Sequence, residues 1–137
     1  MKFKKLTTTA ITPTRGSPNS AGLDLYADAD VLVSSGASVM LGTGIAVEIP
    51  ANHVGLVCIR SSLGKAGVGL TNSVGVIDSD YRGEIMLSLA STSGHYIRRG
   101  ERVAQLIIMP VVPVEMIEVD ALSTTDRGAG GFGSTGR

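Results

Sequence analysis

Residues 84–89 read Glu84-Ile85-Met86-Leu87-Ser88-Leu89, an alternation in which every second side chain is a branched aliphatic one. Successive side chains of an extended chain point to opposite faces, so this period of two predicts a half-buried β-strand. The same period occurs in Ile45-Ala46-Val47-Glu48-Ile49. A fold built on such stretches has one apolar and one polar face on each strand.

Two longer apolar runs, Val54–Ile59 and Val103–Val112, extend the β pattern along the chain. Pro110 and Pro113 interrupt the end of the second run, and a helix interior does not tolerate proline. Turn-forming residues separate the runs at short intervals, at Arg15–Asn19, Ser35-Gly36, Pro50–Asn52, Ser93–His95 and Arg99–Glu101. Many short strands between such turns predict an all-β antiparallel sandwich or barrel with little helix.

The length and composition indicate a single soluble domain. The chain has 137 residues, 43% of them hydrophobic and 18% charged, and twelve basic residues balance twelve acidic ones. A zero formal charge gives no overall attraction to nucleic acid or to a membrane surface. No run approaches the roughly 18 apolar residues of a membrane-spanning helix. We therefore expect a soluble protein of the cytoplasm, or of the host cell interior if its source is viral, with no nucleic-acid or membrane partner.

The glycine-rich C-terminus, residues 127–137, differs in composition from the rest of the chain. Ordering so much glycine without a partner is entropically costly, so a frayed tail is one interpretation. The alternative is a lid, because Phe132 offers a ring to a base and Arg127, Ser134 and Thr135 offer donors to phosphate. The composition leaves both open. This change in composition divides the chain into a β domain over 1–126 and a glycine-rich terminal segment over 127–137.

Two polar segments carry the side chains suited to chemistry. Asp78, in the segment Asn72–Glu84, directly follows Val76-Ile77 and so is expected at a strand end, where desolvation can tune a general base. Taken alone, this segment fits a simple turn better than a catalytic site, because Asp-Ser-Asp is common turn chemistry. The segment Arg60–Lys65 offers cations, hydroxyls and backbone donors near a glycine, as an anion-binding loop does, but it lacks P-loop spacing and also fits an ordinary polar loop.

The order of five motifs resembles that of the trimeric dUTPases. The motifs are Ala21–Ala27, Arg60–Gly64, Asn72–Glu84, Arg99–Leu106 and Arg127–Gly136. The third and fifth are the most specific, and together the five span most of the chain. The resemblance implies a jelly-roll homotrimer whose active sites are shared between subunits, each closed by a flexible glycine-rich tail.

The resemblance also implies an activity. It is the hydrolysis of dUTP to dUMP and pyrophosphate, which limits uracil in DNA and supplies dUMP for thymidylate synthesis. Asp78 is expected to activate the water that attacks the α-phosphorus. Mg²⁺ is expected as the cofactor, held by the substrate phosphates and waters with no direct protein ligand.

Each remaining site residue takes its expected role from the same resemblance. Tyr81 stacks under the deoxyribose, the turn around Asn72 reads uracil, and Asp24 supports the site by pairing with Arg60 and ordering the water shell of the metal. Arg102 is expected in a structural ion pair. The expected substrate-binding residues are Arg60, Ser61, Ser62, Asn72, Gly75, Val76, Tyr81, Gln105, Arg127, Phe132, Gly133, Ser134 and Thr135.

Two departures from the family pattern concern the second motif, where the family usually has glycine in place of Ser62 and proline or glycine in place of Ile59. These departures put the shape of the phosphate loop in question. Two other functions remain as alternatives. A dCTP deaminase shares the fold, but its acid/base carboxylate is missing from Asn72–Val74. A binding protein on the same scaffold would need no turnover, and intact Asp78 and Tyr81 argue against it.

Overall fold

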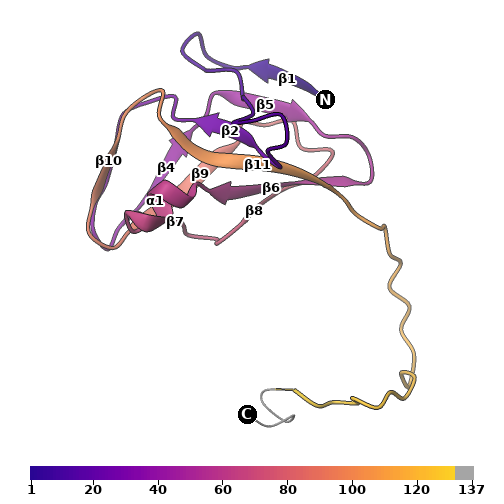
Figure 1. The fold of residues 1–137 in the computed structure, drawn as a ribbon. Helices are drawn as coiled ribbons and strands as arrows, with labels where there is room; N and C mark the ends of the chain where they lie inside the picture. Colours follow the sequence, from indigo (N-terminus) through magenta and orange to yellow (C-terminus); the bar gives the residue numbers. More distant parts are fainter. Residues whose placement is uncertain (132–137) are drawn as a thin grey trace.

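Strand β11 (Arg102–Pro110) is an inner strand of the larger sheet in the computed structural model, which describes residues 1–131 (Figure 1). It pairs antiparallel with β2 (Leu23–Tyr26) on one side and with β6 (His53–Ile59) on the other, and β6 pairs with β8 (Gly75–Ile77). These four strands form the larger sheet, in the order β2-β11-β6-β8. The strand ends at Pro110, where the backbone has no N–H to continue the ladder.

The alternating stretch identified in the sequence forms β9 (Met86–Ser91), the middle strand of a second sheet. Its neighbours are β4 (Ser38–Gly42) and β7 (Val68–Leu70), both antiparallel. Leu87 and Leu89 are 1% and 0% exposed, whereas Met86, which directly precedes Leu87 and points to the other face of the strand, is 42% exposed. The predicted half-buried strand is confirmed.

Shorter elements complete the described part of the chain. Strand β1 (Lys2–Lys5) pairs with β5 (Ile45–Glu48), and β3 (Val31–Val33) pairs with β10 (His95–Ile97). A short helix, α1 (Ser61–Lys65), follows β6. Strand β5 departs from the predicted alternation, because Ala46 is buried as well as its neighbours and the strand is covered on both faces.

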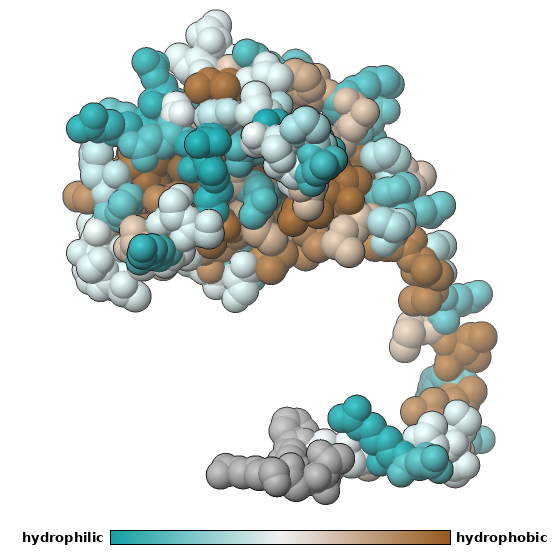
Figure 2. All heavy atoms as spheres, viewed as in Figure 1, coloured by the Kyte–Doolittle hydropathy of each residue, from teal (hydrophilic) through white to brown (hydrophobic). Residues whose placement is uncertain are grey.

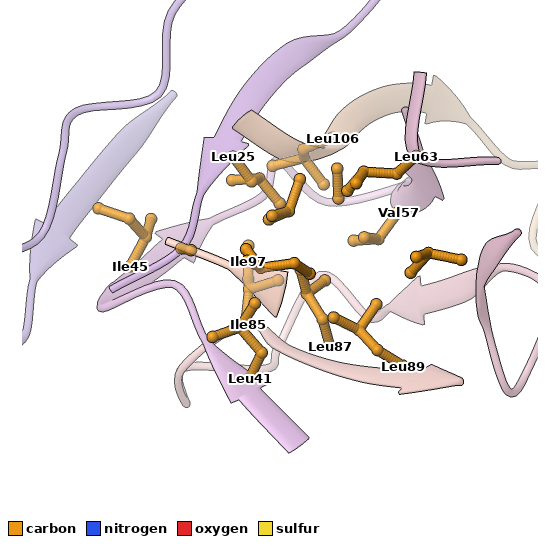
Figure 3. Close-up of a cluster of buried hydrophobic side chains, with 14 of the residues drawn as sticks. Leu25, Leu41, Ile45, Val57, Leu63, Ile85, Leu87, Leu89, Ile97 and Leu106 are labelled. Atoms are coloured by element: carbon orange, nitrogen blue, oxygen red, sulfur yellow. The ribbon is translucent and has the colours of Figure 1, made fainter. Parts of the chain in front are cut away.

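The core lies between the two sheets. Figure 3 shows Leu25, Val57 and Leu106 of the larger sheet facing Leu41, Leu87 and Leu89 of the smaller one. Burying each such side chain contributes about 1.5–3 kcal/mol, so this interface is the main source of stability. The predicted all-β, jelly-roll-like fold is confirmed. Among residues 1–131, no helix is long and apolar enough to cross a membrane.

Beyond Pro110 the chain leaves the domain as an extended segment, residues 111–131, without helix or strand (Figures 1 and 2). Large apolar side chains stand exposed along it, Val112, Val114, Met116, Ile117 and Leu122 being 75–90% exposed. Within residues 1–131 nothing covers these side chains. The extended segment begins well before Arg127, and residues 132–137 of the expected lid lie outside the described residues.

Candidate active site

A pocket of about 270 Å³ lies beside β8 and the start of β9. Its lining comes from one continuous part of the sequence, 72–86, which includes the motif with the most chemistry-bearing residues. The structure therefore brings several predicted site residues together. The lining residues are Asn72, Gly75, Val76, Ile77, Asp78, Tyr81, Glu84 and Met86.

Asp78 directly follows β8, at the strand end where the sequence placed it. Alternation along the strand puts Asp78 on the same face as Val76, and both line the pocket. The backbone N–H of Tyr81 donates to the carbonyl of Asp78 at 3.1 Å, which closes the following turn. The expected desolvation is wrong for the single chain, in which Asp78 is exposed because only β6 and the turn flank it.

Tyr81 reaches across the turn, and its hydroxyl donates to the backbone carbonyl of Glu84 at 3.0 Å. The side chain remains 43% exposed, so one side of the ring is open to a ligand. Gly83 lies against the ring: a Cβ atom there would be 2.5 Å from Cζ of Tyr81. The hydroxyl contact and the missing side chain at 83 together set the position of the ring.

Gly83→Ala is expected to push the Tyr81 ring out of this position, since real Cβ contacts essentially never fall below 3.0 Å. A misplaced ring should lower kcat/KM for dUTP about tenfold and reduce the preference for dUTP over UTP. Steady-state kinetics with both nucleotides measure this. Gly69→Ala is the matched control, because its Cβ would meet nothing within 4 Å. Equal kinetics for the two variants would contradict this role of Gly83.

The turn over residues 71–74, which is expected to read uracil, joins two strands that do not pair with each other. Strand β7 before it pairs with β9 of the smaller sheet, and β8 after it pairs with β6 of the larger sheet. The turn therefore crosses from one sheet to the other, with Ser73 in the left-handed region at φ 61°. Gly75 is needed for packing here, because a Cβ would lie 3.1 Å from Cβ of Val57.

Glu84 and Met86 line the pocket although the sequence did not single them out as site residues. The Glu84 carboxylate accepts a hydrogen bond of 2.7 Å from the backbone N–H of Gly44, so the protein already engages it. Asp78 is thus the carboxylate left facing the pocket. The alternation of residues 84–89 could have identified Glu84 and Met86, because it places both side chains on the face opposite Ile85 and Leu87.

A second group of predicted residues centres on Asp24, which is 8% exposed. One oxygen of Asp24 lies 3.5 Å from Nε of Arg60, and the other accepts a hydrogen bond of 3.2 Å from Nη1 of Arg102. The predicted pairing with Arg60 and the ion pair of Arg102 are both present. The expected ordering of the metal's water shell by Asp24 stays a prediction. Gln105 lies in register with Asp24 and so joins this group.

Helix α1 begins at Ser61, directly after Arg60, and both Ser61 and Ser62 are exposed. The first N–H groups of a helix have no intrahelical acceptor, and no acidic residue lies in this first turn. Ser62 has no positive φ, so the departure from glycine causes no backbone strain there. Ile59 is the last residue of β6 and pairs with Ala104, an ordinary strand position.

The two groups lie at opposite ends of β6. Ile77 pairs with Gly55, which places Asp78 near the start of β6, whereas Arg60 follows its last residue. Five residues of strand from Gly55 to Arg60 span about 17 Å. The pocket around Asp78 accordingly includes neither Arg60, Ser61, Ser62 nor Gln105. A single chain does not bring all the predicted residues to one pocket.

Arg127 lies on the extended segment and does not line the pocket, and its Nε donates to the carbonyl of Gly130 at 3.0 Å. The predicted residues Phe132, Gly133, Ser134 and Thr135 lie outside the described residues. The position of the expected lid relative to the pocket therefore remains a prediction.

Comparison with known proteins decides the family. A family model described as dUTPase matches residues 8–136, nearly the whole chain. The chain belongs to the dUTPase family. The resemblance found in the five motifs and the expected enzyme class are thereby confirmed.

Individual dUTPase relatives match over the full length. The deoxyuridine 5'-triphosphate nucleotidohydrolase of Nautilia profundicola is 45% identical over 140 residues, covering 100% of this chain and 99% of the relative. The dUTPase of Staphylococcus bacteriophage 80alpha, solved with dUPNHPP, superposes with a TM-score of 0.91 at 26% identity, covering 99% of this chain and 98% of that one.

A more distant dUTPase supports the fold. A mutant from phage phi11 of S. aureus, whose structure reveals the coordination of a structural Mg(II) ion, has a TM-score of 0.82 at 21% identity. It covers 88% of this chain and 96% of that one. At this identity the likeness concerns the fold alone.

Proposed function

We propose that this chain hydrolyses dUTP to dUMP and pyrophosphate, and so limits uracil in DNA and supplies dUMP for thymidylate synthesis. The observation that carries the proposal is the pocket that holds the Asp78 carboxylate, the Tyr81 ring and the Asn72 turn together. These are the three groups that a dUTP hydrolase needs: a base for water, a surface for the sugar and a reader for uracil.

Asp78 is the general base in this proposal. Its exposed carboxylate accepts a proton from a water molecule as the water oxygen bonds to the α-phosphorus. The bond from the α-phosphorus to the bridging oxygen breaks, and pyrophosphate leaves on the opposite side. The Glu84 carboxylate lines the same pocket but already accepts a hydrogen bond from the N–H of Gly44, which supports Asp78 as the general base.

Substrate selection falls to the rest of the pocket. The Tyr81 ring packs against the deoxyribose and leaves no room for a 2′-hydroxyl. The Asn72 amide and the backbone up to Val76 pair with the uracil edge, and Gly75 allows the close approach. A polar edge of this kind rejects cytosine strongly, because mismatched donors would leave buried groups unpaired.

The phosphates are bound by the second group of residues. Arg60 supplies charge, and Ser61 and Ser62 supply a hydroxyl and a backbone N–H at the start of α1. Gln105 adds an amide from β11. Asp24, whose carboxylate lies 3.5 Å from Nε of Arg60, pairs with that guanidinium and orients it.

Magnesium fits this site as an ion held by the substrate. Within residues 1–131 no three histidine, cysteine or carboxylate side chains gather closely enough to hold a metal, so phosphate oxygens and waters would be its ligands. When bound, Mg²⁺ neutralises the charge on the phosphates. Arg60 and the residues around it would orient that charged triphosphate.

The complete site needs more than one copy of the chain, in a homotrimer. Two observations support this: the two groups of site residues lie about 17 Å apart along β6, and the extended segment exposes a run of apolar side chains. Apolar runs of this kind mark interaction surfaces. The segment would pack on a second copy and bring residues 127–137 to its pocket, where Arg127, Phe132, Gly133, Ser134 and Thr135 close over the nucleotide.

Subunit complementation tests the shared site. Asp78→Asn chains and chains truncated to 1–126 are refolded separately and as a one-to-one mixture, and dUTP hydrolysis is measured. If the base and the lid come from different subunits, random trimers restore about one quarter of the wild-type sites, half times half. Asp78→Asn chains refolded alone are the control.

Recovery to that level supports the shared site. Activity of the mixture no higher than the sum of its two components would mean that one chain supplies both the base and the lid, and the proposal would be wrong.

A further inference from the structure

Arg82 makes contacts that the proposed chemistry does not use. Its Nη1 donates two hydrogen bonds, to the carbonyl of Ser79 at 2.7 Å and to the carbonyl of Tyr81 at 2.9 Å. Both acceptors belong to the turn between Asp78 and Tyr81, which a third hydrogen bond from Tyr81 N–H to the Asp78 carbonyl closes. One guanidinium nitrogen thus bridges two carbonyls of the backbone between Asp78, the proposed general base, and Tyr81, whose ring is proposed to pack against the deoxyribose.

Arg82 lies on the side of this turn away from the substrate pocket. It lines two other hollows, of about 340 Å³ and 460 Å³, which it shares with Lys2 and Glu48. It does not line the pocket that holds Asp78 and Tyr81. Any influence of Arg82 on the reaction must therefore pass through the backbone of the turn.

We propose that Arg82 is a positioning residue, which fixes the Asp78–Tyr81 turn from behind and so holds the general base and the sugar-stacking ring at a constant separation. This inference rests on the proposed function of Asp78 and Tyr81. A charged donor on a neutral carbonyl forms a stronger hydrogen bond than a neutral one. The turn itself lies outside the strands, and among the described residues it is held by these two bonds, its own closing bond and the bond from the hydroxyl of Tyr81.

The test compares Arg82→Ala, Arg82→Lys and Lys4→Ala with the wild type. Lys4→Ala is the matched control, because it removes one positive charge from a hollow that Arg82 also lines, without touching the turn. We measure kcat and KM for dUTP and UTP, the melting temperature, and amide hydrogen exchange over 78–83. The exchange readout needs no enzyme activity.

In Arg82→Ala, kcat for dUTP is expected to fall about 10- to 100-fold, as for a misplaced base. The melting temperature should match that of Lys4→Ala, the dUTP over UTP preference should fall, and the Tyr81 amide should exchange faster. The lysine variant should recover part of kcat, because its ammonium can donate to the same carbonyls.

The assignment of Arg82 would be overturned if kcat of Arg82→Ala for dUTP were within twofold of that of Lys4→Ala. It would also be overturned if amide hydrogen exchange over 78–83 were the same in Arg82→Ala as in the wild type. An inactive wild-type protein would instead overturn the proposed function. In that case the exchange comparison alone still decides whether Arg82 holds the turn.

Discussion

Asp78→Asn is expected to bind dUTP with nearly wild-type affinity and to hydrolyse it about 10²–10⁴-fold more slowly. Asparagine has the size of aspartate but accepts no proton from water at neutral pH. The side chain faces the pocket, and the strand before it stays paired with β6 whichever residue is at 78. The loss should therefore appear in kcat, with KM little changed.

Asp80→Asn is the matched control for Asp78→Asn, since Asp80 lines the hollow on the far side of the same turn and not the substrate pocket. Calorimetric titration with dUTP and single-turnover hydrolysis separate binding from chemistry. If Asp78→Asn turned over dUTP as fast as Asp80→Asn, Asp78 would not be the base.

Deletion of residues 127–137 is expected to lower kcat/KM for dUTP by about 10²-fold and to leave the fold intact. The described hydrogen bond of the Arg127 side chain stays within the C-terminal segment, so its loss removes no described contact of the β domain. Without the lid, water keeps access to the bound triphosphate, and the donors of Arg127, Ser134 and Thr135 are lost.

Thermal melting and size-exclusion chromatography of the truncated chain check the fold, and pyrophosphate release checks the activity. Arg127→Ala in the full chain serves as the comparison, because it removes one donor and keeps the rest of the segment. Full activity in the truncated chain would contradict the assignment of residues 127–137 as a lid.

The strands were predictable because their periodicity is local. Leu87 and Leu89 repeat every second residue and are buried as the period requires, and Pro110 ends β11 where an N–H is missing. Asp78 was placed at a strand end by the apolar pair before it. Each of these features depends on near neighbours in the sequence.

Other features depend on strand pairing, which a local pattern does not contain. The turn around Asn72 crosses between sheets because β7 and β8 find different partners. The distance between Asp78 and Arg60 follows from the register of β8 on β6. The exposure of Asp78 likewise follows from the sheet order, since β8 is an edge strand.

The most direct test of the account is pyrophosphate release from dUTP, dCTP, dTTP and UTP, each with magnesium and with EDTA. We expect rapid release from dUTP alone, dependent on magnesium, because Tyr81 excludes the ribose and the Asn72 turn reads uracil. Equal release from several nucleotides would contradict the roles of Tyr81 and Asn72. No release from any of them would contradict the proposed hydrolysis itself.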